Sequence, residues 1–207
     1  MLADGATPAL TRINRRTFAC VELFEGLGKC ALPWNDLQRF IVEKRVAAGA
    51  SVFAQDDAHP FLYVVRAGLI KLVYERDDGE AWIKSFAQEG RFFASIAALK
   101  TGGRASFSAV ALEETRLERI DAAPLLDLAD RHLEWSRAVR EALTLFAGRK
   151  EKRERELLTL GAEERYRAAL RDEPDLVARV PQKDLALYLG VTPVGLNRIA
   201  RRVRGEA

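Results

Sequence analysis

Hydrophobic and polar positions follow a period of two over the middle of this chain. From Lys44 to Ile120, short apolar runs are separated by turn residues, which include Gly49, Gly68, Asp77-Asp78-Gly79, Gly90 and Gly102-Gly103. In one run, the apolar residues Ile70, Leu72 and Tyr74 occupy alternate positions, as expected for a strand with one buried face. Strands spaced this closely predict an antiparallel β sandwich or roll.

Apolar residues at helical spacing precede this β region. Residues 1–17 show no period and are predicted to be a flexible arm. The apolar residues between Leu23 and Leu27 indicate a short helix that ends at Gly28. The stretch after Pro33 predicts a second helix through Trp34, Leu37, Phe40 and Ile41. Within the β region, the small side chains of residues 92–99 are more typical of a helical turn than of a strand.

A long helix is predicted from about His132 to Leu160. Along it, apolar residues recur at the 4-3-4 spacing of a helix that pairs with another helix, namely Trp135, Val139, Ala142 and Phe146. We therefore expect these four residues to form a dimer interface. The charged run at residues 149–156 favours a solvated helix face, with a second nucleic-acid contact as the alternative.

The residues after this helix predict a compact group of three short helices. The first spans residues 162–171, and the second carries Leu185, Ala186 and Leu189 and ends at Gly190. The third begins with Thr192 as its N-cap and Pro193 in its first turn, and its apolar positions are Leu196, Ile199 and Val203. The last two helices form a helix-turn-helix.

Positive charge is concentrated on that helix-turn-helix. Residues 181–204 contain five Lys or Arg residues against one Asp, a net charge of +4, whereas the whole chain carries +3. The face of the last helix opposite its apolar stripe carries Val194, Arg198 and Arg201, with Asn197 and Arg202 at its edges. A cationic helix of this kind suits insertion into a DNA major groove.

The remaining composition argues against other classes of function. Two cysteines, Cys20 and Cys30, and two histidines are too few and too scattered for a zinc or iron-sulfur site, so no metal and no cofactor are expected. A haem ligated by His59 is the weaker alternative to a surface turn at that residue. No catalytic residues are assigned, because neither histidine lies near a nucleophile motif. Free thiols and the lack of a signal peptide or apolar span predict a cytoplasmic protein without a membrane partner.

These stretches together resemble the Crp/Fnr family of bacterial transcription regulators. The resemblance is carried by LYVVRAGLIKLVYERDDGE (62–80), FAQEGRFFAS (86–95), SAVALEETRLERI (108–120) and the helix-turn-helix. It implies an α+β fold: an N-terminal antiparallel β roll of the cyclic-nucleotide-binding kind, a long dimerisation helix and a C-terminal, winged-helix-like helix-turn-helix domain. The domains expected are an arm at 1–17, a sensor at 18–120, a linker and dimerisation helix at 121–160, and a DNA-binding domain at 161–207.

The resemblance also implies partners and site residues. The protein would be a homodimer that binds double-stranded DNA and works with RNA polymerase. Arg198 would read a guanine, Asn197 a base or a phosphate, and Pro193 and Val194 would offer only apolar contact. Contacts to the DNA backbone would come from Gln182, Lys183, Thr192, Arg201 and Arg202.

The resemblance is incomplete at the effector site. Relatives that bind cyclic AMP need a Gly-Glu pair and an Arg followed by Ser or Thr, but this chain has Ala94-Ser95 and Arg104-Ala105-Ser106. The sequence therefore favours a small effector other than cyclic AMP, held through Ser95, Arg104 and Ser106, or a regulator that needs no effector. The alternative function is a ligand-binding signalling module whose helix-turn-helix contacts a protein. A disulfide between Cys20 and Cys30 is a further, less favoured means of sensing.

Overall fold

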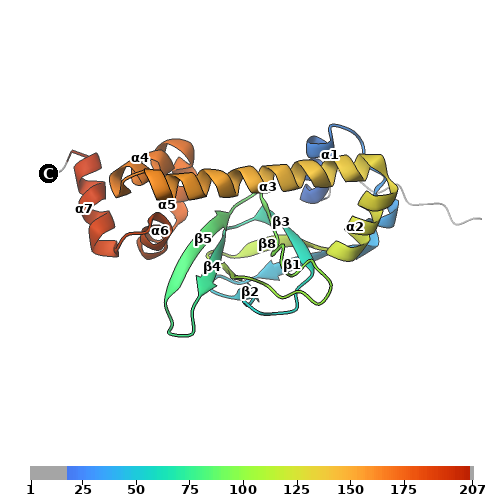
Figure 1. Cartoon of the computed structure of the whole chain (residues 1–207), viewed down its shortest axis with the longest axis horizontal. Coiled ribbons are helices and arrows are strands. Elements are labelled where there is room, and N and C mark those ends of the chain that lie inside the picture. The colour runs from blue at the N-terminus through green and yellow to red at the C-terminus, as the bar shows by residue number, and fades with distance from the viewer. Residues whose placement is uncertain (1–17, 206–207) are drawn as a thin grey trace, which may run out of the picture.

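A computed structural model describes residues 18–205. The predicted flexible arm at residues 1–17 lies outside this range. Figure 1 shows a β roll below one long helix, with a group of short helices at the far end of that helix. No helix in the described part of the chain is long and apolar enough to cross a membrane.

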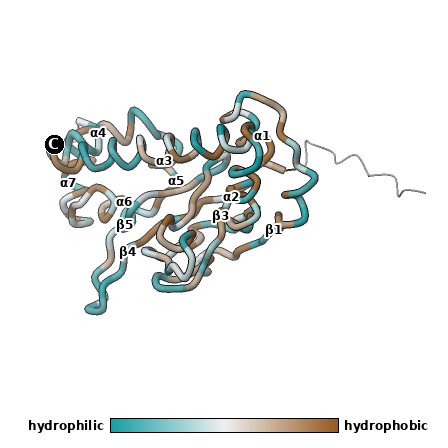
Figure 2. Tube along the Cα trace, turned by 45° about the vertical axis from the view of Figure 1, so that its right-hand side comes forward, coloured by the Kyte–Doolittle hydropathy of each residue, from teal (hydrophilic) through white to brown (hydrophobic). Residues whose placement is uncertain are grey.

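The β roll consists of two four-stranded antiparallel sheets, as the period of two predicts. One sheet has the order β1-β8-β3-β6, and the other has the order β2-β7-β4-β5. The strands are β1 (Ile41–Val46), β2 (Ser51–Phe53), β3 (Phe61–Ala67), β4 (Ile70–Glu75), β5 (Ala81–Ala87), β6 (Phe92–Phe93), β7 (Ser108–Ala111) and β8 (Thr115–Asp121). In Figure 2 the tip of the β4–β5 hairpin is hydrophilic, which agrees with its solvent-exposed position.

The alternation read along β4 holds only for its first half. Ile70 and Leu72 are buried, but Tyr74 is 39% exposed and Val73 is buried instead. The register shifts at this point, because Leu72 faces Ser85 while Val73 faces Ile83. A bulge therefore places Lys84 as an extra residue in β5.

Two short predictions at the edges of the roll need correction. The expected helix from Trp34 to Ile41 is wrong, because this stretch forms two 3-10 turns, η2 (Trp34–Asp36) and η3 (Gln38–Phe40), and Ile41 already begins β1. The segment 92–99 begins as strand β6, which pairs with Tyr63 and Val64, and only then makes a turn. Ile41 pairs with β8 and residues 92–93 pair with β3, and local spacing does not reveal these distant partners.

Helix α1 (Ala19–Gly28) packs against the long helix and begins without a side-chain cap of its own. The buried carboxylate of Glu118, on β8, accepts hydrogen bonds from the backbone N–H groups of Ala19 and Cys20, each at 2.7 Å. The helix ends at Gly28, as expected, and Lys29, the next residue, has left-handed backbone geometry. Because of the Glu118 contacts, the first turn of α1 is fixed to the roll.

The long helix α3 (Leu133–Thr159) matches the predicted segment His132–Leu160 to within one residue at each end. It follows α2 (Ala122–Arg131), from which the extended backbone of His132 separates it. Helix α3 lies along the β roll and reaches the C-terminal helices, so it joins the roll to those helices (Figure 1).

The C-terminal region, which follows α3, contains four helices: α4 (Ala162–Asp172), α5 (Pro174–Arg179), α6 (Gln182–Leu189) and α7 (Pro193–Val203). Helix α5 was not predicted, because six residues with a proline at the start are too short to show a helical period. No strand occurs from Ala162 to Gly205. Leu69 of the roll lies in one hydrophobic core with Leu176, Leu185 and Leu189, and this core joins the C-terminal helices to the roll.

Candidate functional site

The turn between α6 and α7 has the geometry that its sequence predicts. Gly190 has φ 68°, in the left-handed region, and the N–H of Val191 donates to the carbonyl of Ala186 at 3.0 Å. The Thr192 hydroxyl accepts a hydrogen bond from the N–H of Gly195 at 3.0 Å, and Pro193 occupies the first helical position. Local chemistry therefore fixes where α7 begins.

Loss of this cap should destabilise the protein measurably. Thr192→Ala is expected to lower the free energy of unfolding by about 1 kcal/mol, because one N–H of the first turn loses its acceptor. Thr192→Ser keeps the hydroxyl and should retain nearly all of the stability. Urea unfolding of both variants checks this expectation, and equal losses in the two would contradict it.

All nine residues predicted to contact DNA are exposed on α6, α7 or the turn between them. They are Gln182, Lys183, Thr192, Pro193, Val194, Asn197, Arg198, Arg201 and Arg202. Val194 is 64% exposed, which is unusual for a valine and leaves it free to contact a partner. The opposite face of α7 is covered, since Leu196 and Ala200 are buried against α4 and α6.

Sequence reasoning missed the side chains that position this helix pair. Arg165, on α4, donates from Nε to the carbonyl of Leu189 at 2.9 Å and from Nη1 to the carbonyl of Leu160 at 2.6 Å. Arg153, on α3, donates to the carbonyl of Tyr188 and lies over its ring. These arginines satisfy carbonyls at helix ends and so connect α3, α4 and α6.

Ion pairs hold the C-terminal helices against the β roll. Lys71 on β4 pairs with the buried Asp184 on α6 at 3.0 Å, and Arg91 pairs with Glu173 at 3.3 Å. Arg179 on α5 pairs with Glu89 at 2.8 Å and with Glu113 at 2.7 Å. These contacts hold α5, α6 and Glu173, which lies between α4 and α5, against the β roll.

The Arg179 contacts should make stability depend on pH. Hydrogen bonds from Arg179 lower the pKa of Glu89 from 4.5 to about 2. Because the pKa is depressed in the folded state, this stabilisation is present above pH 4.5 and is lost as the pH falls toward 2. Both carboxylates are partly exposed, so we expect a loss of about 1 kcal/mol or less at pH 7 in Arg179→Ala. Melting curves from pH 2 to pH 7 should show a shallower acid decline in this variant than in the wild type, and identical declines would contradict the assignment.

The predicted effector residues are only partly brought together. The hydroxyl of the buried Ser95 accepts from the N–H of Ser106 at 3.0 Å and lies 3.3 Å from the Ser106 hydroxyl. Arg104 is exposed and donates to the carbonyl of Asp56 at 2.6 Å. The buried Ser95 hydroxyl is therefore already engaged within the protein, Ser106 is exposed, and Arg104 is held by a neighbouring turn.

Aromatic side chains fill the interior of the roll beside these residues. The ring centroids of Tyr63 and Phe93 lie 5.2 Å apart, and those of Phe53 and Phe107 lie 5.6 Å apart. His59 stacks on Phe53 at 4.6 Å and bonds the Tyr63 hydroxyl at 2.8 Å. Burial and nearby Lys44 lower the pKa of His59, which favours the neutral ring.

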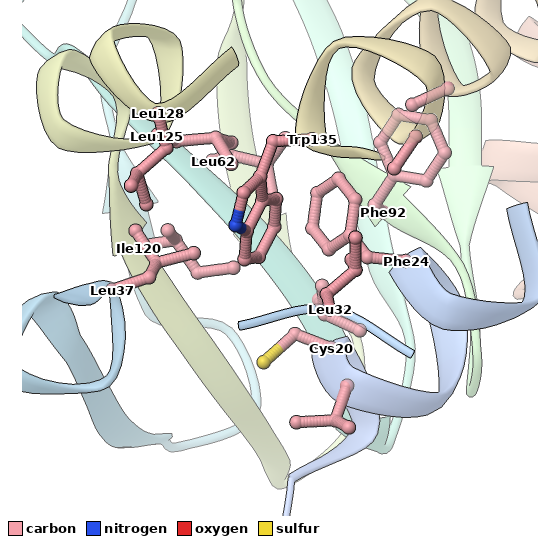
Figure 3. Close-up of a cluster of buried hydrophobic side chains, with 14 of the residues drawn as sticks. Cys20, Phe24, Leu32, Leu37, Leu62, Phe92, Ile120, Leu125, Leu128 and Trp135 are labelled. Atoms are coloured by element: carbon pink, nitrogen blue, oxygen red, sulfur yellow. The ribbon is translucent and has the colours of Figure 1, made fainter. Parts of the chain in front are cut away.

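The predicted dimer seam on α3 faces inward, and the prediction is wrong for its first and third residues, Trp135 and Ala142, which the chain's own core buries. Trp135 is fully buried and Ala142 is 6% exposed, and both lie in the core formed with α1 and the roll. Val139 and Phe146 are partly buried and pack against the same core. Figure 3 shows the Trp135 ring among Phe24, Leu62 and Ile120. A 4-3-4 apolar spacing indicates that a helix face is covered, but it does not indicate which surface covers it.

Cys20 and Cys30 are both free in the described part of the chain, and burial together with Glu118 raises the pKa of the Cys20 thiol. Within residues 18–205, no group of three His, Cys, Asp or Glu side chains is arranged to hold a metal ion.

Comparisons with known proteins relate the chain to one group of folds. Residues 43–132 match the family model of the cyclic nucleotide-binding domain. FixK2 from Bradyrhizobium japonicum matches with a TM-score of 0.72 at 18% identity, covering 80% of this chain and 85% of that one. The c-di-GMP responsive regulator CLP of Xanthomonas campestris matches with a TM-score of 0.64 at 18% identity, covering 81% and 88%.

A third solved structure is described as a putative transcriptional regulator of the Crp/Fnr family from Eubacterium rectale. It matches with a TM-score of 0.65 at 13% identity, covering 82% of this chain and 81% of that one. No curated protein matches the sequence.

Proposed function

Given that this chain has the fold of the Crp/Fnr regulators, we propose that it is a homodimeric, sequence-specific DNA-binding transcription regulator controlled by a small effector other than cyclic AMP. The observation that carries this proposal is the exposure of every basic and polar residue on the outer face of α7. A helix that is packed on one side and cationic on the other is suited to the major groove.

The residues of α7 divide into two roles. Arg198 is exposed and bears the planar donor fork that recognises guanine, so it is the residue that we assign to base reading. Asn197 lies beside it, and Pro193 and Val194 offer apolar contact, for example to a thymine methyl group. Contacts to phosphates are assigned to Gln182, Lys183, Thr192, Arg201 and Arg202.

A dimer would use the outer face of α3 instead of the inward seam. This face exposes leucines along its length, with Leu133 at 61%, Leu143 at 49% and Leu158 at 78%. These leucines lie on the side of α3 that the core leaves exposed, and a second copy of the helix packed there would cover them. Two recognition helices about 34 Å apart would then enter successive major grooves of a near-palindromic site, beside which the regulator would contact RNA polymerase.

The sensor half supports control by a ligand other than cyclic AMP. Ser95 occupies the place of the carboxylate that cyclic AMP needs, and its hydroxyl is already bonded to Ser106. CLP, one of the structural matches, is described as responsive to c-di-GMP, so this fold accepts other effectors.

Salt-dependent binding to duplex DNA tests the proposal. We expect the full chain to bind a mixed duplex at 50 mM salt and to weaken steeply as salt rises, because phosphate contacts release counterions. Absence of binding to any duplex at 50 mM salt would contradict the function and favour the alternative, a signalling module whose helix-turn-helix contacts a protein.

A further inference from the structure

A carboxylate of α4 holds one arginine of the face that we assign to DNA. Arg202, at the edge of the outer face of α7, donates from Nη1 to Oε2 of Glu163 at 3.0 Å. Glu163 lies in the first turn of α4, which packs against α7. The other two arginines of this face, Arg198 and Arg201, form no ion pair within residues 18–205. The charge of Arg202 is thus already opposed in the free protein, whereas theirs is not.

The same carboxylate accepts hydrogen bonds from a second arginine. Arg167, one turn further along α4, donates to Oε1 of Glu163 from Nε at 3.1 Å and from Nη2 at 2.9 Å. Glu163 therefore brings two guanidinium groups from different helices to one point. Hydrogen bonds from Arg167, and then from Arg202, lower the pKa of Glu163 from its ordinary value. The carboxylate is ionised at neutral pH.

Arg167 and Arg202 together form a site for an anionic group, and the group that occupies it belongs to the chain itself. Guanidinium groups recognise carboxylates and phosphates with the same N–H donors. The side chains of Arg202 and Arg167 are 64% and 53% exposed, so an external phosphate can reach both. Exposed ion pairs contribute little to stability, so the fold does not depend on Glu163 staying in place.

We propose that Glu163 is an internal competitor of DNA phosphates: it holds Arg202 and Arg167 in the free protein, and a backbone phosphate takes both arginines when α7 enters the major groove. This inference rests on the proposed function and adds Arg167, on α4, to the residues that contact DNA. The competition acts on contacts to the DNA backbone. It therefore lowers the affinity for all duplexes and leaves base reading by Arg198 unchanged.

Glu163→Gln tests the competition, because the amide keeps the shape of the side chain and removes its charge. Fluorescence anisotropy with the full-length protein measures the affinity for two unrelated duplexes at 50 mM salt. We expect both affinities to rise by about threefold or more, since Arg202 and Arg167 no longer have to leave a carboxylate. The melting temperature of the free variant should stay close to that of the wild type, because the lost ion pairs are exposed.

Two controls separate this competition from a general effect of charge. Glu164→Gln removes the same charge from the next residue, which accepts from the N–H of Gly161 at 2.7 Å, and it should change affinity much less. In an Arg202→Ala background, Glu163→Gln should also change affinity much less than in the wild type, because one of the contested arginines is gone. An equal gain in both backgrounds would overturn the inference.

Arg167→Ala tests the new contact on α4. This variant should weaken binding to all duplexes alike and reduce the slope of log affinity against log salt by about one. Arg131→Ala removes an exposed arginine of α2, at the opposite end of α3 from α7 (Figure 1), and should leave the slope unchanged. A wild-type slope in Arg167→Ala would overturn the role of this residue.

Failure of this inference is distinguishable from failure of the proposed function. If the wild type binds no duplex at 50 mM salt, the regulatory function and the competition are both contradicted. If the wild type binds duplex DNA and Glu163→Gln leaves the affinity unchanged or lowers it, only the competition is overturned.

Discussion

Replacing Trp135 by alanine is expected to lower the free energy of unfolding by about 3–5 kcal/mol, because a fully buried indole leaves a large cavity. The ring lies 4.8 Å from that of Trp34 and 6.1 Å from that of Phe24, measured between centroids. It therefore joins α3 to the N-terminal segment and the roll. Urea unfolding followed by circular dichroism measures the loss.

Two matched variants distinguish a core role of Trp135 from a role in dimerisation. Its Nε1–H has no hydrogen-bond partner within residues 18–205, so Trp135→Phe should lose much less stability than the alanine variant. Leu158→Ala, at a residue that is 78% exposed, should change stability by about 0.5 kcal/mol or less but weaken the dimer. If Trp135→Ala instead keeps full stability and becomes monomeric, Trp135 would belong to a dimer interface, as its apolar spacing first suggests.

Removing the Arg198 side chain should mainly reduce discrimination between DNA sequences. Arg198→Ala is expected to weaken binding to the preferred site by about 10- to 100-fold, the equivalent of about 1–3 kcal/mol, because a bidentate contact with guanine is lost. Binding to unrelated duplexes should fall far less. Fluorescence anisotropy with the preferred site and with a scrambled duplex measures both affinities.

Arg202→Ala provides the control for Arg198→Ala. Arg202 pairs with Glu163 at 3.0 Å near the end of α7, away from the positions assigned to base reading. Its removal should weaken all duplexes alike and reduce the slope of log affinity against log salt by about one. Equal effects of the two substitutions on both duplexes would show that Arg198 does not read bases.

Features set by neighbouring residues were predictable from the sequence. Gly190, Thr192 and Pro193 fix the turn and the start of α7 through contacts within a few residues, and the structure has each of them as expected. The boundaries of α3 were equally accessible, because a helix of 27 residues shows its period many times. The α+β fold class is confirmed by the sheet topology, and the likeness of the fold to that of a Crp/Fnr regulator is confirmed by the structural matches.

Features set by distant residues were not predictable in this way. Arg179 and Glu89 are 90 positions apart, and nothing local to either shows that they pair. The prediction of a dimer interface at Trp135 and Ala142 was wrong for the same reason, since the apolar period of α3 is identical whether a partner or the chain's own core covers it. The DNA contacts, the effector residues and the domain boundaries remain predictions.

Selection of binding sites from a pool of random duplexes tests the central claim most directly, namely that two copies of α7 read DNA together. The account predicts that the full-length protein enriches an inverted repeat whose half-site centres are about 10–10.5 base pairs apart, or a multiple of that distance. Enrichment of a single half-site, or of no sequence at all, would contradict it.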